Sequence, residues 1–426
     1  MGDTLSETGR NASEARGARG ARFRIGPFPA RRIHRRRMSS QRSSSSTWTP
    51  SALITVLVAG MVGCATSSEQ VFPDPEWHYE TAGLSPEVAG EVDLFVRTLE
   101  TTGLMVVKGG KVIYEYGDVA EVSYIASVRK SVLSMLYGPY VADGTIHLDD
   151  TLADLGISDV GGLLPTEERA TVLDLITARS GVYHPACYDT GSFDQAPERG
   201  SQEPGSYWLY NNWDFNVAGT VFERTTGKNI YDALLEDLAI PLGMQDFDRE
   251  QQQADERPDR SQHPQYTMWL STRDMARLGY LMSRQGRWGE RQLIPADWVR
   301  RSTSVVTPIR ELHPEYMRSE PFGYGYMWWV RDGEFATGPY RGAYTAAGAN
   351  GQWITVLPVL GMVVAHKTYW SSTGGPKHEV RRSDYYRLLD LLTRYEPATT
   401  EELRRWKEAT KAGGIDGDPT GSSRPE

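Results

Sequence analysis

The sequence predicts an α/β fold in which an α+β sandwich lobe, with an antiparallel sheet flanked by helices, carries an inserted all-α lobe. Strand-like hairpins occur near both ends of the folded part of the chain, at 104–117 around Gly109–Gly110 and at 352–367 around a tight connection. Between them, residues 143–304 show short helical patterns separated by Gly- and Pro-rich loops. We therefore expect one sheet built from distant segments, with a cleft between the two lobes.

Apolar periodicity places the other elements. Helices are predicted at 86–100, 127–142, 171–178, 215–226, 388–395 and 401–411, and a further strand at 325–330. Residues 186–205 are polar and irregular, which is typical of a functional loop. The predicted organisation is a leader at 1–63, a tether at 64–85, a folded domain at 86–395, and a C-terminal helix with a loose tail at 396–426. Within the domain, the α/β lobe comprises 86–142 and 305–395, and the helical lobe comprises 143–304.

The first 63 residues differ from the rest in charge. They carry eleven Arg, no Lys and three acidic residues, a net charge of +8, whereas the whole chain is −9, so the remainder carries −17. A basic, Ser-rich start followed by a short apolar run at 51–63 is typical of a signal peptide, and the run is too short to span a bilayer, which takes roughly 20 apolar residues. Because this leader is long, we take translation from Met38 as a hypothesis.

Cys64 directly follows Gly63, and this junction resembles the lipobox of bacterial lipoproteins, in which the cysteine is acylated. The resemblance implies an exported protein held by a lipid at the cell envelope, and we expect the outer membrane, facing the periplasm. Met61 departs from the usual leucine of that motif. An ordinary signal peptide or an uncleaved anchor, with Cys64 incidental, remains the alternative.

Composition argues against several classes of function. Cys187 is the only cysteine besides Cys64, so no intramolecular disulfide is expected in the mature fold. No Cys or His pair has metal-ligand spacing, and we predict neither a metal nor another cofactor. The acidic domain offers no basic stripe for a nucleic acid. Oligomeric state does not follow from the sequence.

Ser127-Val128-Arg129-Lys130 is the only S-x-x-K among the eight lysines of the chain. If Ser127 begins a helix, Lys130 lies one turn further on the same face. A serine hydroxyl needs a base, which a neutral lysine supplies, and the free N–H groups of a helix N-terminus suit a developing oxyanion. In isolation such a tetrapeptide is more often a helix cap with an exposed lysine.

Tyr210-Asn211-Asn212 supplies a second element, Y-x-N, which also occurs once. A phenol normally titrates near pH 10, but a cationic lysine beside it favours the phenolate, which is able to take a proton from a serine. Asn212 is expected to orient the lysine or to bind the substrate carbonyl. The alternative is an aromatic-rich loop that packs the helical lobe.

Ala346-Ala347-Gly348-Ala349 is the third element, just before the predicted strand at 352–358. A small, glycine-containing stretch beside a sheet edge lets a substrate backbone come close. The backbone N–H of Ala349 is then a candidate oxyanion donor together with that of Ser127.

In the order and separation of these three elements, the chain resembles the serine β-lactamase and penicillin-recognising superfamily, class C-like branch, from about residue 86 to 395. Further segments that carry the resemblance are Ala142-Asp143-Gly144, Leu148-Asp149-Asp150, Ser180-Gly181, Glu203-Pro204-Gly205, Pro241-Leu242-Gly243-Met244, Ser271-Thr272-Arg273-Asp274-Met275-Ala276-Arg277 and Tyr324-Gly325-Tyr326. The resemblance implies a β-lactamase/transpeptidase-like fold and an acyl-enzyme mechanism that uses Ser127, Lys130 and Tyr210.

One position departs from the family pattern. Many β-lactamases and carboxypeptidases of this superfamily have Lys or His where this chain has Ala346, and that cation helps to bind a substrate carboxylate. The A-x-G sequence resembles the esterase and amidase members, especially the nylon-oligomer (6-aminohexanoate-dimer) hydrolases. In that comparison Tyr188 corresponds to a pocket tyrosine that hydrogen-bonds the substrate amide, with a plain loop aromatic as the alternative.

The sequence therefore predicts a serine hydrolase that cleaves a small ester or amide, with Asn212, Tyr188, Gly348 and Ala346 at the substrate. A β-lactamase or D-alanyl-D-alanine carboxypeptidase is the first alternative. A penicillin-binding or sensor lipoprotein without turnover is the alternative from another class. We expect the 186–205 loop and aromatic side chains to shape the pocket. The aromatic candidates are Trp208, Tyr326 and Trp328.

Overall fold

The computed structural model describes residues 71–80, 83–370 and 378–394, all of them within one compact unit. The predictions for the leader, Met38, Cys64, the 401–411 helix and the C-terminal tail lie outside the described residues. Among the described helices, none is both long and apolar enough to cross a bilayer.

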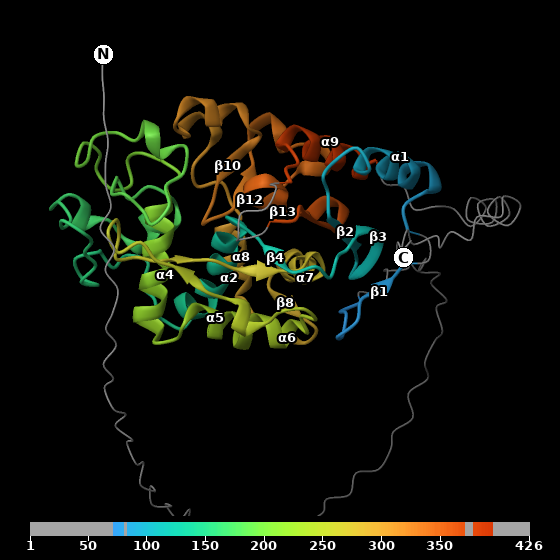
Figure 1. Cartoon of the computed structure of the whole chain (residues 1–426), viewed down its shortest axis with the longest axis horizontal. Coiled ribbons are helices and arrows are strands. Elements are labelled where there is room, and N and C mark those ends of the chain that lie inside the picture. The colour runs from blue at the N-terminus through green and yellow to red at the C-terminus, as the bar shows by residue number, and fades with distance from the viewer. Residues whose placement is uncertain (1–70, 81–82, 371–377, 395–426) are drawn as a thin grey trace, which may run out of the picture. The chain divides into compact units, whose positions relative to one another are not determined.

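The main sheet combines strands from both ends of the domain, as predicted (Figure 1). Neighbouring strands pair antiparallel, except that β1 runs parallel to β3, so the sheet is mixed rather than purely antiparallel. In spatial order the strands in the described part are β1 (His78–Tyr79), β3 (Lys111–Gly117), β2 (Gly103–Lys108), β14 (Met362–Lys367), β13 (Gln352–Leu357), β12 (Tyr344–Gly348), β11 (Trp329–Arg331) and β10 (Phe322–Tyr324).

Helices cover both faces of this sheet. Alternation along β2 sends Leu104 and Val106 into the core beneath α1 (Pro86–Val96) and α9 (Arg382–Leu392), and Met105 and Val107 into the core beneath α2 (Val128–Ala142) and α7 (Thr272–Ser283). Figure 1 shows α1 and α9 side by side on one side of the sheet. The α/β lobe is therefore confirmed as a sheet between helices.

The segment between the two halves of the sheet is less purely helical than predicted. Helix α7 packs on β2, β13 and β14, so it belongs to the sheet lobe although its sequence lies within 143–304. The remaining helices are α3 (Val172–Ile176), α4 (Asn212–Thr226), α5 (Ile230–Ala233), which continues through a π-helical stretch (Leu234–Ala239) into α6 (Ile240–Leu242), and α8 (Ala296–Ser302). Short strand pairs interrupt them: β4 (Ser123–Tyr124) with β7 (Trp269–Leu270), β5 (Ala254–Asp255) with β6 (Gln265–Tyr266), and β8 (Arg287–Trp288) with β9 (Arg291–Gln292).

The described part of the predicted tether packs on the domain. Its β1 strand pairs with β3, and the buried guanidinium of Arg277 on α7 donates hydrogen bonds to the carbonyl oxygens of Pro73, Asp74 and Pro75. A buried arginine needs acceptors, and these backbone oxygens supply them. Residues 73–79 are thus part of the fold, and the 64–85 tether prediction was wrong for them.

Two strands near the site also differ from the prediction. Where one strand was expected at 325–330, β10 and β11 are separated by a turn in which Met327 has a φ of 61°. The β12 strand was not predicted, because its Ala-Ala-Gly end has little strand propensity of its own. It pairs with β11 only at Tyr344 and Thr345, so the stretch from Ala346 to Gly348 has a strand neighbour on the β13 side alone.

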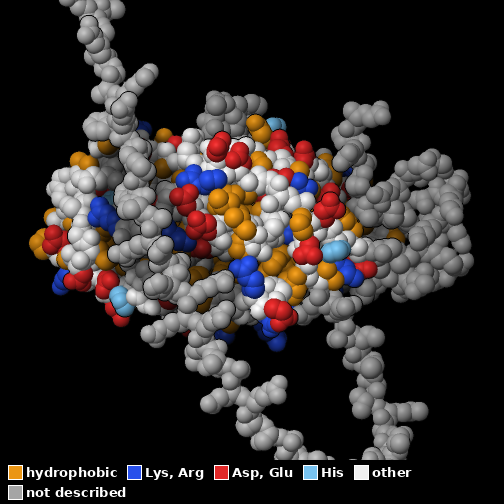
Figure 2. Space-filling view, turned by 90° about the horizontal axis from the view of Figure 1, so that it is seen from below, with side chains coloured by type: hydrophobic (Ala, Val, Ile, Leu, Met, Phe, Trp, Pro, Cys, Tyr) orange, Lys and Arg blue, Asp and Glu red, His pale blue; other side chains and the backbone are white. Residues whose placement is uncertain are grey.

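The surface carries interspersed charge. Figure 2 shows acidic and basic side chains interleaved on the face seen from below, without a field of one sign.

Candidate active site

Ser127 lies immediately before the first residue of α2, as predicted. The residue before it, Ala126, has a φ of 50°, which is a conformation that a non-glycine residue seldom adopts. Ser127 lines a pocket, whereas the α2 residues that follow it are buried. The strained turn thus presents the serine to the pocket while the helix remains in the core.

Lys130 lies one turn into α2 and is almost completely buried, with 1% of its surface exposed. Its Nζ lies 3.1 Å from the Oγ of Ser127, 2.7 Å from the Oη of Tyr210 and 2.7 Å from the Oδ1 of Asn212. Burial, reinforced by the positive charge of Arg129, lowers the pKa of Lys130 well below its usual value. A neutral amine in this position is able to accept the hydroxyl proton of Ser127 while it donates to Asn212.

Tyr210 lies two residues before the start of α4, and its hydroxyl contacts the same lysine. Its carbonyl oxygen accepts hydrogen bonds from the hydroxyl groups of Thr190 and Ser192, and its ring packs on Phe215 and Trp329 with centroids 5.0 and 5.4 Å away. Burial raises the pKa of Tyr210, and its interaction with Ser127 only partly offsets this effect. The phenol is therefore protonated at neutral pH, whereas the sequence had favoured a phenolate beside a charged lysine.

Asn212 joins the lysine to the 186–205 loop. Its Oδ1 accepts from Lys130, and its Nδ2 donates to the carbonyl oxygen of Tyr188 over 2.7 Å. Both polar ends of the amide are used, which suits the first of its two expected roles, to orient Lys130; the second, binding of the substrate carbonyl, stays a prediction. The contact with Asn212 uses the backbone of Tyr188, while its side chain, 46% exposed, lines the pocket.

The end of β12 forms the opposite wall. Ala347, Gly348 and Ala349 line the pocket, and Asn350 after them has a φ of 63°. In the described loops, turns and helix caps, neither the Ser127 amide nor the Ala349 amide donates a backbone hydrogen bond. Both residues line the same pocket, so their N–H groups stay the predicted pair of donors to an oxyanion.

One of the four residues proposed for substrate binding, Ala346, has a different place. Ala346 is completely buried in the main core and does not line the pocket, because strand alternation turns it away from the side that Ala347 faces. Gly348 lines the pocket but is also required by packing, since a Cβ there would lie 2.6 Å from the carbonyl oxygen of Ile125. The glycine lets β12 approach the segment that precedes Ser127.

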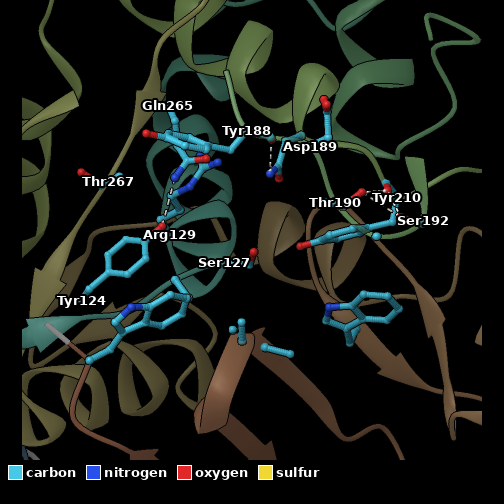
Figure 3. Close-up of a pocket in the computed structure, with 18 of the residues that line it drawn as sticks. Tyr124, Ser127, Arg129, Tyr188, Asp189, Thr190, Ser192, Tyr210, Gln265 and Thr267 are labelled. Carbon is cyan, nitrogen blue, oxygen red and sulfur yellow. Dashed lines mark hydrogen bonds between the residues drawn. The ribbon is translucent and has the colours of Figure 1, made fainter. Parts of the chain in front are cut away.

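The pocket has a volume of about 980 Å³. Figure 3 shows Tyr210, Thr190 and Ser192 on one side of Ser127, and Tyr124, Arg129, Gln265 and Thr267 on the other. The predicted aromatic residues Trp208, Tyr326 and Trp328 do not line it, and Trp208 and Trp328 are buried in the core. The aromatic residues that do are Tyr124, Tyr188, Tyr210, Trp269, Tyr316, Trp329 and Trp370.

Sequence reasoning missed two arginines of this pocket. Arg382, at the start of α9, lies 3.4 Å from Glu320 in an ion pair. Arg129 is the third residue of the S-x-x-K tetrapeptide and is 1% exposed. The sequence did contain a feature that points to Arg129. Charged residues are seldom buried without a reason, and Arg129 lies in a helix turn between the apolar Val128 and the predicted catalytic Lys130.

No group of three or more His, Cys, Asp and Glu side chains in the described residues has the arrangement of a metal site. Cys187 is buried, and its Sγ donates to the carbonyl oxygen of Asp255 while burial raises the thiol pKa. A thiol in this state is a poor nucleophile. The amine of Lys130 joins the hydroxyl groups of Ser127 and Tyr210, and both of these residues line the pocket together with Ala349.

This fold and this set of groups are those of the serine hydrolases of the β-lactamase fold. A family model described as Beta-lactamase matches residues 93–391, and the chain belongs to that family. A relative in Alkalihalophilus pseudofirmus, an uncharacterized protein, is 22% identical over 279 residues, which cover 60% of this chain and 75% of that protein.

Solved structures share the fold at low identity. A Bacillus anthracis protein named as a candidate 6-aminohexanoate-dimer hydrolase is 16% identical with a TM-score of 0.51, over 76% of this chain and 83% of its own. A penicillin binding protein from Bacillus halodurans is 15% identical with a TM-score of 0.51, over 71% and 98% of the two chains. EstCE1, a hydrolase with promiscuous acyltransferase activity, is 14% identical with a TM-score of 0.51, over 72% and 98%. At these identities the likeness concerns the fold alone.

Proposed function

We propose that this protein hydrolyses a small ester or amide through an acyl-enzyme on Ser127. The observation that carries the proposal is the position of the Lys130 Nζ, within hydrogen-bond distance of the hydroxyl groups of both Ser127 and Tyr210. A buried amine between two hydroxyl groups is suited to move a proton from one to the other.

In acylation, the Oγ of Ser127 attacks the substrate carbonyl carbon, and its proton passes to neutral Lys130. The backbone amides of Ser127 and Ala349 bind the resulting oxyanion. When the bond to the leaving group breaks, Tyr210 donates its phenolic proton to the leaving oxygen or nitrogen, and Lys130 returns the serine proton to Tyr210. The lysine and the tyrosine thus end the step as they began it.

In deacylation, water attacks the ester carbonyl that links the acyl group to Ser127. The proton lost by water passes to the neutral amine of Lys130 as the new bond forms. The pair of Lys130 and Tyr210 then returns a proton to the Oγ of Ser127 when the acid departs. No group outside this pair is needed for the proton balance.

Several features favour a small ester or amide over a β-lactam or a peptidoglycan stem peptide. Ala346 does not supply the cation that many β-lactamases and carboxypeptidases have at this position for a substrate carboxylate, and Arg382, which lines the pocket, already pairs with Glu320. A binding protein without turnover would gain nothing from burying Lys130 beside a serine, since burial of an amine has a desolvation cost.

Labelling with a fluorophosphonate, followed by intact-mass spectrometry, tests the proposal on wild type and Ser127→Ala. We expect a single adduct on wild type and none on the variant, and hydrolysis of 4-nitrophenyl esters by wild type alone. Ester turnover that survives in Ser127→Ala would overturn the assignment. Turnover of nitrocefin or of a D-alanyl-D-alanine peptide would favour the first alternative, and a stable adduct without turnover would favour the binding protein.

We further propose that a lipid on Cys64 holds this hydrolase at the cell envelope. The support for this part is the signal-peptide pattern at 51–63 followed by the cysteine.

A further inference from the structure

The guanidinium of Arg129 is buried at the pocket wall with one nitrogen unused. Its Nη2 donates to the Oδ1 of Asn216 over 3.0 Å, and its Cζ lies 4.2 Å from the ring centroid of Tyr266. Its Nη1 has no partner in hydrogen-bond geometry within the described residues, although Arg129 is only 1% exposed and its guanidinium interacts with the hydroxyl groups of Tyr124 and Tyr266. Leaving a buried charged donor unpaired is costly, so an unpaired one at a pocket indicates a partner that arrives with a ligand.

No carboxylate within the described residues forms an ion pair with Arg129. The acid near Arg129 is Asp255, which also lines the pocket. Burial raises the pKa of Asp255 overall, and the positive charge of Arg129 offsets part of that increase. The other acids at the pocket are engaged, Asp189 with Arg260 and Glu320 with Arg382. The hydroxyl of Tyr124 accepts a hydrogen bond from Gln265. The cation of Arg129 is therefore incompletely neutralised.

The position of Arg129 relative to Ser127 decides which part of a substrate it meets. Tyr210, the proposed acid for the leaving group, lies on one side of Ser127, and Arg129 lies on the opposite side beside Tyr124 and Gln265 (Figure 3). A tetrahedral centre on Ser127 with its leaving group toward Tyr210 directs its acyl chain toward Arg129.

We propose that Arg129 binds a carboxylate carried by the acyl part of the substrate, so that the enzyme prefers monoesters or monoamides of dicarboxylic acids. This inference rests on the proposed hydrolase function and names the substrate class of that site. A guanidinium presents its donors in a planar fork that matches a carboxylate, and such charge-assisted bonds are stronger than neutral ones. The aromatic rings of Tyr124, Trp269 and Trp370 line the same pocket and suit the apolar chain between the two carbonyl groups.

Two 4-nitrophenyl esters of one length test the preference. One is the monoester of adipic acid, whose acyl chain ends in a carboxylate, and the other ends in the neutral primary amide. The readout is the ratio of kcat/KM for the anionic ester to that for the neutral ester within each protein. We expect a wild-type ratio of at least about ten, the size of a hydrogen bond to a charged group. A third ester, with its carboxylate on the leaving alcohol instead, reports whether the effect belongs to the acyl side.

Three variants complete the experiment. Arg129→Gln should bring the ratio close to one, Arg129→Lys should keep part of it, and Asp255→Asn should raise it because a competing negative charge is removed. A wild-type ratio near one, or an unchanged ratio in Arg129→Gln, overturns the inference. If Arg129→Gln does not fold, as judged by thermal unfolding, an unchanged ratio in Asp255→Asn does the same.

Failure of the substrate assignment is distinguishable from failure of the hydrolase itself. If wild type is labelled at Ser127 by fluorophosphonate but shows no preference between the two esters, only the proposed role of Arg129 is refuted. If folded wild type is neither labelled nor able to cleave either ester, the proposed hydrolase function is refuted, and so is the substrate class that rests on it.

Discussion

The Nζ of Lys130 lies 3.1 Å from the Oγ of Ser127, one helical turn along α2. The distance alone does not make the lysine a base, since a lysine in water is protonated at neutral pH. Burial changes this, because the pocket side of Lys130 is closed by Tyr210 and Asn212 and the amine has almost no exposed surface. The same burial that lowers the pKa of the lysine raises the pKa of the phenol, so it favours the neutral form of both groups.

These opposite shifts predict a bell-shaped pH profile of kcat/KM. Activity should rise as the pH increases through the lowered pKa of Lys130, since only the neutral amine accepts a proton, and should fall as the pH passes the raised pKa of Tyr210, above its usual value near 10. Tyr210→Phe should reduce kcat/KM by roughly 10²–10⁴-fold and remove the alkaline limb while the acid limb stays. Steady-state rates with a neutral ester measure both limbs, and thermal unfolding at each pH shows that the fold persists. An alkaline limb that remains in Tyr210→Phe would contradict the role of this phenol.

Asn212→Asp should move the acid limb to higher pH. The substitution places a carboxylate where the amide oxygen now lies 2.7 Å from Nζ, and a negative charge there favours the protonated lysine. We expect a displacement of roughly one to three pH units in the acid limb, with lower activity at pH 7 than at pH 9. Asn212→Leu serves as the control, since it removes the hydrogen bond without adding charge and should lower the rate with less displacement. Equal acid limbs in wild type and Asn212→Asp would show that Lys130 is not the titrating base.

The sequence was sufficient to predict contacts between residues that lie within one turn of the same helix. Ser127 and Lys130 are one helical turn apart, so their proximity follows from helix periodicity once the helix is recognised. Tyr210 and Asn212 come from a segment about eighty residues away, and their meeting with Lys130 depends on how α4 packs on α2. Only the family resemblance predicted that contact.

What the sequence did not predict depends on the direction of side chains and on strand pairing. The sequence pattern assigned no role to Arg129, because no periodicity shows that a guanidinium between Ser127 and Lys130 faces the pocket. Ala346 was placed at the substrate, whereas β12 pairs in a register that turns its side chain into the core. The aromatic residues of the pocket were also misassigned, since a tryptophan packs equally well in a core and at a pocket wall.

Gly348→Ala should impair the enzyme through the backbone. The new Cβ would lie 2.6 Å from the carbonyl oxygen of Ile125 and 3.1 Å from the Cβ of Ala126, so β12 or the turn before Ser127 must move. We expect a loss of about 1–3 kcal/mol in the free energy of unfolding, as for an overpacked core, and at least a tenfold fall in kcat/KM, roughly the 1.4 kcal/mol that corresponds to a factor of ten. Gly90→Ala is the matched control, because Gly90 lies in α1 with no atom within 4 Å of its Cβ position, and it should leave the rate unchanged. Equal activity in the two variants would show that the close approach of β12 to Ile125 is dispensable.

Lys367 gives a prediction on stability that is independent of catalysis. Its Nζ, buried at the end of β14, donates to the carbonyl oxygens of Ser123 and Leu270, and burial lowers its pKa to about 7. In the unfolded chain the amine titrates near 10.4, so between these two values the unfolded state binds a proton that the folded state does not, and stability should rise with pH. The loss of stability caused by burying the charged amine is fully present below pH 7.

From pH 7 to pH 9 the free energy of unfolding of wild type relative to Lys367→Met should increase by roughly 2 kcal/mol. Urea unfolding of both proteins across this range measures the difference, and taking it between the two proteins removes the contribution of every other titrating group. A difference that does not change with pH would mean that Lys367 keeps its charge state on folding, and that its two carbonyl contacts are enough to hold a buried ammonium.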